Sequence, residues 1–385
     1  TLLASSAASD VYKRQILGDV FVSALKAIAP LLVFFLVVSS LCNAGKSHGG
    51  VIKTVIILYM FSTVLAAVIA VFASMAFPVK MTLANAATDT SAPQGIVEVL
   101  NNLLLNVVAN PVSSLVNANY VGILMWAVLL GLAFRAADKM TKKVLADVAD
   151  GISMVVTWII NLAPFGIFGL VFNTVSTNGL DIFTTYGKLL LLLVGCMLFI
   201  YFVTNPLLVY WCIRQNPYPL IFHCLKRSAL TAFFTRSSAA NIPVNMKVCE
   251  EMGLDRDTYS VTIPLGATIN MDGAAITITV MTMATAFTLG IHVDIPTAII
   301  LSLLAALSAC GASGVAGGSL LLIPMACSLF GISDDISMQV VAVGFIIGVV
   351  QDSVETALNS SSDLLLSASA EFRQWRLEGK EIKFK

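Results

Sequence analysis

Long apolar segments constrain this chain more than any other feature. A helix that crosses a bilayer needs about 20 mostly apolar residues, and of the 385 residues here 58% are hydrophobic and only 11% are charged. Soluble domains are about a quarter charged. The sequence therefore predicts an all-α polytopic membrane protein. The candidate spans are Ile16–Leu41, Val51–Phe77, Val121–Phe134 with its lead from Val99, Ile152–Phe172, Leu189–Ile213, Tyr259–Leu289 and Ile336–Ala370.

The composition excludes several classes of function. The 22 basic and 22 acidic residues cancel, so no net basic field favours nucleic-acid binding. The cysteines are scattered without a CxxC pair, which argues against a metal–thiolate site or a disulfide framework. The only histidines, His48, His223 and His292, fall in or near predicted loops, whereas a serine hydrolase needs a base beside its nucleophile. We expect neither an enzyme nor an organic cofactor.

The lysines and arginines predict the orientation, because they stay on the cytoplasmic side of a membrane. Basic residues mark the connections after the first, third and fifth spans as cytoplasmic loops. The connections 78–98 and 173–185 contain a single lysine between them and are expected outside. The basic tail Arg373–Lys385 then ends in the cytoplasm.

Two further segments fit this alternation only as re-entrant hairpins. Ser228–Met246, the inner hairpin, has Arg227 before it and Lys247 after it, so it enters and leaves by the cytoplasmic face. Pro296–Phe330, the outer hairpin, is interrupted by glycines and lacks basic flanks, and it is too short for two full crossings. Two hairpins that meet near the midplane from opposite faces are typical of secondary transporters with inverted repeats.

Acidic residues inside the last apolar segment indicate a buried site. Asp352, Thr356, Asn359 and Asp363 are spaced so that they return to one helical face. A carboxylate at bilayer depth costs about 2.5–3.5 kcal/mol. Two on one stripe favour a site for a cation or an ammonium group over a fortuitously paired acid.

Two motifs place more polar residues at the same depth. Thr235-Arg236-Ser237-Ser238 is expected at the tip of the inner hairpin, where hydroxyls and free N–H groups can bind an anion, although small residues also serve helix packing. The run from Gly266 through Asn270 and Asp272 to Gly273 lies mid-span. It predicts an unwound turn whose carbonyl oxygens could bind sodium.

With these motifs in this order, the sequence resembles the dicarboxylate/amino acid:cation symporter family, which has the glutamate-transporter fold. The resemblance runs from about Gly18 to the end of the last span and includes the glycine-rich segment Gly311–Ser319. It is strongest to the bacterial branch of sodium/serine–threonine symporters. The resemblance implies eight spans, two re-entrant hairpins, inverted repeats and a homotrimer surrounded by lipid in the inner membrane. Since the chain shows about seven spans, the first helix of that fold is expected to be missing.

The domain organisation follows from the same resemblance. Residues 1–15 are predicted to be a non-native leader, because Ala8–Gln15 looks like translated adapter sequence. Residues 16–385 form a single transporter domain. Its spans at about 16–41 and 100–172 would form the trimer scaffold, while about 51–77 and 189–370, with both hairpins, would form the moving transport unit.

The resemblance also implies the residues that bind an amino acid. Asp352 would bind the α-ammonium group, whereas Ser238, Thr356 and Asn359 would hold the α-carboxylate and Gly314–Gly317 would close over the substrate. The expected substrate-binding set is Ser237, Ser238, Val315, Gly317, Asp352, Glu355, Thr356 and Asn359.

Three candidate sodium sites are expected by the same resemblance, which leaves the number of co-transported ions open. The first would sit on Asp363 with carbonyls near Gly266, Asn270 and Asn359. The second would use Thr268 and carbonyls near Ala309, Cys310 and Ala312. The third would use Tyr59, Ser62, Thr63, Asn270 and Asp272.

Two departures bear on the substrate. Glu355 stands where transporters of acidic amino acids have an arginine, and Ala274 where they have a threonine. A glutamate repels a carboxylate instead of pairing with it, so we expect a small neutral hydroxy amino acid, serine or threonine, as the substrate. The resemblance implies that it is imported with sodium by an elevator-type mechanism. The alternatives are that Glu355 only pairs with Arg236, and that the chain is a sodium- or proton-coupled carrier of dicarboxylates or acidic amino acids. A dedicated channel is disfavoured, since the sequence lacks ring-forming repeats.

Overall fold

In a computed structural model of the chain, the regular elements that are described are all helices. The described residues are 2–43, 50–83, 104–105, 108–117, 119–162, 164–166, 168–169, 172, 182–310 and 317–382. The first part of the chain contains α1 (Leu2–Asn43), α2 (Gly50–Ala76), α4 (Pro111–Val116), α5 (Tyr120–Ala133), the 3₁₀ turn η1 (Phe134–Ala136) and α6 (Lys139–Asn161). The middle contains α8 (Ile182–Phe199), the π-turn η2 (Ile200–Thr204), α9 (Asn205–Ile213), α10 (Tyr218–Cys224), the π-turn η3 (Leu225–Ala229), α11 (Leu230–Thr235) and α12 (Ser238–Glu251). The remainder contains α13 (Arg256–Ile269), α14 (Asp272–Thr288), α15 (Ile295–Ala309), the 3₁₀ turn η4 (Leu320–Leu322), α16 (Ile323–Ser328) and α17 (Asp334–Leu377).

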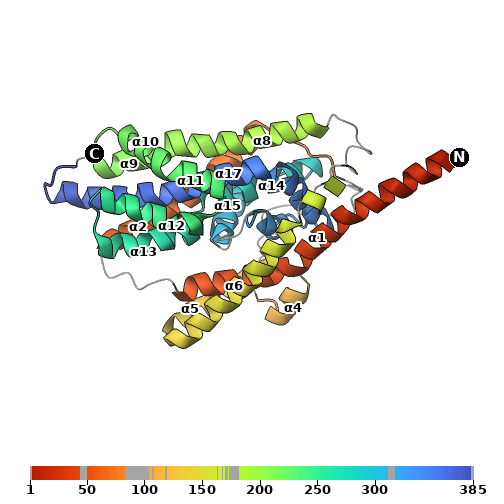
Figure 1. Ribbon diagram of the computed structural model, residues 1–385, viewed down its shortest axis with the longest axis horizontal. Coiled ribbons are helices and arrows are strands. Elements are labelled where there is room, and N and C mark those ends of the chain that lie inside the picture. The colour runs from red at the N-terminus through yellow and green to blue at the C-terminus, as the bar shows by residue number, and fades with distance from the viewer. Residues whose placement is uncertain are drawn as a thin grey trace.

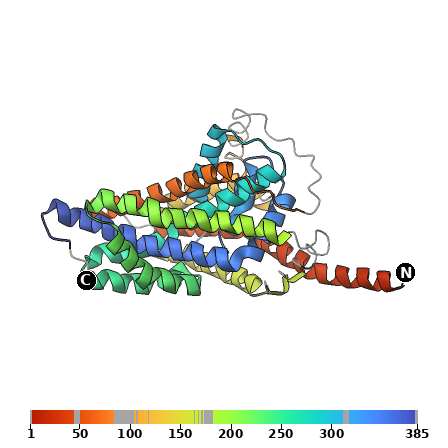
Figure 2. The same cartoon turned by 90° about the horizontal axis from the view of Figure 1, so that it is seen from above.

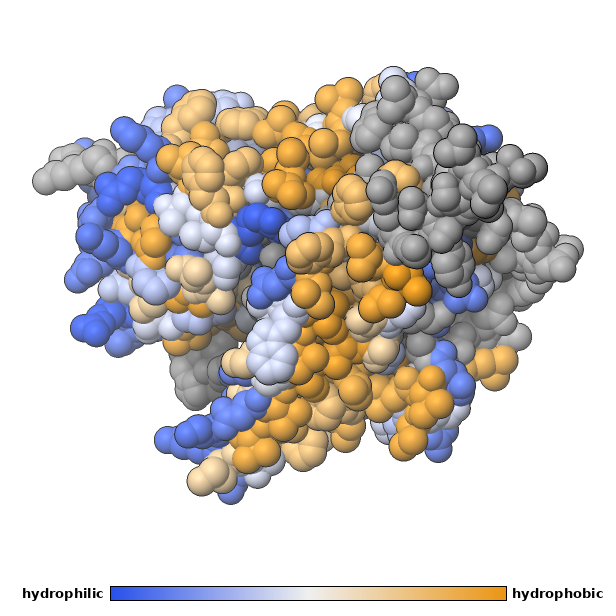
Figure 3. All heavy atoms as spheres, turned by 45° about the vertical axis from the view of Figure 1, so that its right-hand side comes forward, coloured by the Kyte–Doolittle hydropathy of each residue, from blue (hydrophilic) through white to orange (hydrophobic). Residues whose placement is uncertain are grey.

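Several of these helices are suited to a bilayer. Within the described part of the chain, five helical stretches are long and apolar enough to cross it: Ile16–Asn43, Gly50–Ala76, Thr184–Ile213, Arg256–Thr288 and Asp334–Leu377. Each overlaps one of the predicted spans, so the membrane class inferred from the apolar segments is confirmed. Figure 3 shows hydrophobic side chains over the middle of one face and hydrophilic ones toward its ends, as a lipid-exposed surface requires.

The predicted boundaries in the first half are less accurate. The expected span Ile152–Phe172 overlaps α6, but α6 begins at Lys139 and ends at Asn161. Lys139, Lys142 and Lys143 therefore occupy the first turns of a helix, not the loop that the charge pattern predicted. The helix starts there because Asp138 Oδ1 accepts a hydrogen bond of 2.7 Å from the Thr141 N–H, which satisfies a free donor of the first turn. The start of α6 is therefore set by a local helix cap, and the apolar pattern used for the prediction contains no information about that cap.

The helices fall into two groups. α1 packs along α5 and α6, while α17 runs through a larger group in which it contacts α2, α8, α9 and α11–α14. Figure 1 shows the first group along the lower side and α17 inside the second. In Figures 1 and 2 the N-terminal part of α1 projects beyond the other helices. The residues predicted to be a non-native leader continue α1 without a break, since that helix begins at Leu2.

The two groups meet beside the segment that follows the outer hairpin tip. α16 packs against α5, and η4 and α17 contact α1. The rings of Phe21 on α1 and Phe345 on α17 lie edge to face with centroids 5.4 Å apart. This arrangement places the η4 side of the outer hairpin against the proposed scaffold helices.

The inner hairpin reverses direction around Arg236 and Ser237. Arg236 has a left-handed backbone, with φ of 51°, that ends α11, and the Ser237 side chain accepts a hydrogen bond of 3.2 Å from the Ala240 N–H to begin α12. Because Ser228 Oγ donates to Asn245 Oδ1 at 2.5 Å, the two arms lie side by side. The helix–turn–helix form matches the predicted hairpin, whereas its re-entry into a membrane remains a prediction.

The predicted interruption in the Tyr259–Leu289 span is confirmed. α13 ends at Ile269 and α14 begins at Asp272, so Asn270 and Met271 connect two half-helices in the interior. Asn270 and Asp272 are fully buried there. Half-helix ends inside a membrane protein leave backbone groups free for ligands.

The first helix of the outer hairpin, α15, is capped by Asp294, which lies outside the predicted spans. Asp294 Oδ1 accepts a hydrogen bond of 2.9 Å from the Thr297 N–H at the start of α15. Hydrogen bonds from Thr297 hold the pKa of Asp294 below its usual range. The cap is therefore fully charged at neutral pH and would weaken only as the pH falls through that lowered pKa. The tip residues 311–316 lie outside the described part of the chain.

Candidate functional site

The acidic stripe lies on one continuous buried helix, as the spacing predicted. Asp352, Thr356, Asn359 and Asp363 are all on α17 and are no more than 6% exposed. The stripe faces three other segments, because its side chains bond to Arg236 at the inner hairpin turn, Gly317 beyond the outer tip, and the α13–α14 break. These elements are far apart in sequence and converge on α17.

Asp352 links both hairpins. Its Oδ2 accepts a hydrogen bond of 2.7 Å from Arg236 Nε, which also forms an ion pair, and its Oδ1 accepts one of 3.1 Å from the Gly317 N–H. Both oxygens thus already receive donors from the protein. An ammonium group could bind here only by replacing or sharing these donors.

Glu355 has different partners from those expected. Its Oε2 accepts hydrogen bonds from Thr277 at 2.7 Å, Ser319 at 2.9 Å and Gln351 at 2.5 Å. The alternative that Glu355 only pairs with Arg236 is wrong, because Arg236 pairs with Asp352. The reason is geometric: Glu355 lies three residues further along α17, toward α14.

The other predicted substrate residues are partly used by the protein itself. Thr356 Oγ1 donates to the Asp352 carbonyl at 2.7 Å, and Asn359 Oδ1 accepts from the Gly273 N–H at 2.7 Å. Ser238, in the first turn of α12, is 8% exposed. Val315 and the rest of the predicted closing segment Gly314–Ala316 lie outside the described residues. The substrate assignments therefore remain predictions.

The predicted residues of the first sodium site come together around Asp363. Its Oδ1 accepts a hydrogen bond of 2.9 Å from Asn270 Nδ2, while Asp363 Oδ2 and Asn270 Oδ1 are buried and have no hydrogen-bond partner among the described residues. Gly266 lies so close that a Cβ there would fall 2.7 Å from Asp363 Oδ1. The pocket thus offers two unpartnered oxygens and admits no side chain at Gly266.

A second carboxylate forms a separate cluster. Ser62 Oγ donates to Asp272 Oδ2 at 2.7 Å, and Thr63 Oγ1 donates to Asp272 Oδ1 at 3.2 Å. Tyr59, expected in this set, instead directs its hydroxyl to the Asp363 carbonyl at 2.9 Å and to Ser367 Oγ at 2.7 Å. The Tyr59 hydroxyl therefore belongs with the Asp363 cluster.

The residues of the predicted second sodium site are only partly described. Thr268 Oγ1 bonds the Leu265 carbonyl of its own helix at 2.7 Å, while Cys310 Sγ lies 3.8 Å from the Ile269 carbonyl oxygen. Ala309 is buried at the end of α15. Ala312 lies outside the described residues, so this set stays a prediction.

Sequence reasoning missed three residues that bond to Glu355 and one that bonds to Asn270. Thr277, Ser319 and Gln351 surround Glu355, and Ser362 Oγ accepts from Asn270 Nδ2 at 2.9 Å. Gln351 could have been found, since it lies one helical turn before Glu355 on the same apolar segment. The contact of Ser319 depends on the outer hairpin and leaves no periodic pattern.

Asp272 and Asp363 are buried carboxylates inside apolar spans, and their described hydrogen-bond donors are uncharged. Such carboxylates are typical of membrane transporters. The model of the sodium:dicarboxylate symporter family matches residues 3–371, and this chain belongs to that family. A curated relative is the Serine/threonine transporter SstT of Bifidobacterium adolescentis, which is 60% identical over 366 residues; these cover 95% of this chain and 85% of the relative.

Proposed function

We propose that this protein imports serine and threonine together with sodium ions. The observation that carries the proposal is the environment of Asp363 and Asp272, two fully buried carboxylates whose described neighbours are hydroxyl and amide groups. A buried carboxylate stays ionised only beside a compensating charge, and a cargo cation would supply it. Oxygen donors of this type suit a hard cation.

The substrate class follows from Glu355 and Ala274. Glu355 occupies the interior beside Asp352, and a substrate side chain with a second carboxylate would be repelled there. A small hydroxyl side chain can donate to Glu355 instead. The relative named for serine and threonine supports this choice. A dicarboxylate would need a cationic side chain to pair with its second carboxylate. The dicarboxylate alternative is disfavoured because Arg236, the guanidinium that contacts the stripe, already pairs with Asp352.

Sodium entry provides the driving force in this proposal. Each sodium ion that enters down 100 mV contributes about 2.3 kcal/mol. Cation binding at Asp363 and Asp272 neutralises acids that otherwise resist crossing the bilayer, so loading permits movement. Coupling results if movement is allowed only for the fully loaded or the empty site.

The movement proposed is an elevator-type shift of the transport unit, about 51–77 and 189–370, against a scaffold of about 16–41 and 100–172. The separate packing of α1, α5 and α6 supports this division. We also propose that both hairpins are re-entrant parts of inverted repeats, and that the chain forms a homotrimer in a bacterial inner membrane with its C-terminus in the cytoplasm.

The test is uptake into proteoliposomes with sodium imposed from outside and a panel of labelled amino acids. We expect serine and threonine to accumulate, and aspartate and glutamate to enter at least about tenfold more slowly, since one unfavourable charge contact of about 1.4 kcal/mol suffices for that ratio. Replacement of sodium by choline should abolish accumulation. Faster uptake of aspartate than of serine would refute the substrate assignment.

A further inference from the structure

The turn Gly317–Ser319, which leads into η4, is fastened to α17 by two adjacent carboxylates. The Gly317 N–H donates to Asp352 Oδ1 at 3.1 Å, and Ser319 Oγ donates to Glu355 Oε2 at 2.9 Å. Ser319 is only 1% exposed. We call Gly317–Ser319 the latch turn. Its two donors, a backbone N–H and a serine hydroxyl, lie two residues apart in the chain.

The hydrogen bonds around Glu355 Oε2 place this oxygen as an acceptor. Gln351 Nε2 donates both to Thr277 Oγ1 at 2.8 Å and to Glu355 Oε2. Thr277 therefore turns its hydroxyl hydrogen toward Glu355. Glu355 Oε2 is held in place as an acceptor by residues of α14 and α17, and it receives the Ser319 hydroxyl as one further donor.

These two contacts have the chemistry of a hydroxy amino acid. Such a substrate carries a nitrogen donor at its α-carbon and a hydroxyl donor on its side chain. Asp352 and Glu355 are three residues apart on α17, which places them on neighbouring positions of one face. The latch turn presents the same pair of donors, an N–H and a serine hydroxyl, to the same pair of carboxylates.

We infer that the latch turn is an internal stand-in for the substrate: in the empty carrier, the Gly317 N–H replaces the ammonium group at Asp352 and the Ser319 hydroxyl replaces the substrate hydroxyl at Glu355. The inference rests on the proposed function and deepens it. A substrate must displace these donors to bind. When it leaves, the latch turn again donates to Asp352 Oδ1 and Glu355 Oε2. The donors from Arg236, Thr277 and Gln351 stay in place throughout.

This exchange of donors has a consequence for the transport cycle. Net uptake requires the empty carrier to return across the membrane, whereas exchange of internal for external substrate uses the loaded carrier in both directions. The latch turn stabilises only the empty form. Loss of the Ser319 hydroxyl should therefore slow net uptake and spare exchange.

The experiment compares Ser319→Ala with the wild-type protein in proteoliposomes. We expect net sodium-driven serine uptake to fall at least about tenfold, the factor that corresponds to one buried hydrogen bond, and serine–serine exchange to stay within about twofold. An equal loss in both assays, or no loss in net uptake, would overturn the inference. If the wild-type protein exchanges no serine, the proposed function itself fails.

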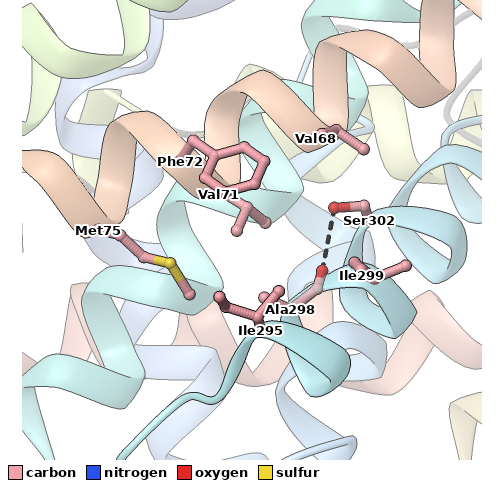
Figure 4. A pocket seen from close by; sticks show the side chains of 8 residues that line it. All are labelled: Val68, Val71, Phe72, Met75, Ile295, Ala298, Ile299 and Ser302. Carbon is pink, nitrogen blue, oxygen red and sulfur yellow. Dashed lines mark hydrogen bonds between the residues drawn. The ribbon is translucent and has the colours of Figure 1, made fainter.

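The control is Ser302→Ala in the same hairpin. Ser302 is 1% exposed, and its hydroxyl donates to the Ala298 carbonyl of its own helix at 3.0 Å. Figure 4 shows this bond at a small apolar pocket between α15 and α2, with Val68 and Phe72 on the opposite wall. This variant removes a buried serine hydroxyl without touching α17, so both assays should be unchanged.

A second measurement does not depend on transport. Backbone amide hydrogen exchange over residues 317–328 is compared in substrate-free detergent solution for the wild type, Ser319→Ala and Ser302→Ala. We expect faster exchange only in Ser319→Ala, because one of the two fastenings is lost. Equal protection in all three proteins would contradict the latch even if serine transport were established.

Discussion

Replacement of Asp363 by alanine is expected to weaken the sodium affinity of serine uptake by at least about thirtyfold. Asp363 is the charged member of the cluster with Asn270 and Gly266, and its Oδ2 is available for a ligand. Loss of one partner from a buried charge pair costs about 2–5 kcal/mol, or roughly 30- to 5,000-fold in affinity. The measurement is the sodium concentration for half-maximal uptake in proteoliposomes.

The matched control for this variant is Ser369→Ala. Ser369 is buried on the same helix, and its hydroxyl donates to the Leu365 carbonyl at 2.7 Å. Its removal should leave the sodium dependence unchanged. If Asp363→Ala accumulates serine with wild-type sodium dependence, the carboxylate does not bind the coupling ion.

Asp352→Asn should abolish high-affinity serine binding, while sodium binding at Asp363, compared with the wild type in the absence of serine, stays within a few fold. The neutral amide can no longer attract an ammonium group, and by the same reasoning the loss is about 2–5 kcal/mol. The measurement separates the half-saturating concentrations of serine and sodium. Equal weakening of both would indicate general damage to the site.

Asp352 also neutralises Arg236, so the single substitution leaves a charge without its partner. The double variant Arg236→Met with Asp352→Asn removes that charge and should fold at least as well as the single variant. Serine binding should stay lost in the double variant. Its recovery would mean that Asp352 serves only to neutralise Arg236, and the proposed role in substrate binding would fall.

The fold was predictable where physical constraints are local. The apolar lengths of α2 and α17 and the break between α13 and α14 follow from bilayer thickness and from Asn270 and Asp272 in a span. The start of α6 could not be predicted from apolar length, because the Asp138 cap and a first turn rich in lysines extend the helix beyond the apolar stretch.

The sequence predicted which residues belong to the candidate site better than it predicted which atoms they contact. The stripe on α17 fixed Asp352 and Asp363 by periodicity. The partners of these acids depend on how the hairpins pack, and a sequence pattern does not record that packing. Arg236 illustrates the limit: its position at the turn was evident, but whether it reached Asp352 or Glu355 depended on the path of the inner hairpin.

The most direct test of the account measures sodium affinity in the purified protein with and without saturating serine. If the site closes only when both the ions and the zwitterion are bound, each strengthens the binding of the other by an equal factor. We predict that serine raises the apparent sodium affinity at least about tenfold, or about 1.4 kcal/mol of coupling, and that sodium raises serine affinity equally. Sodium affinity that is independent of serine would contradict the account.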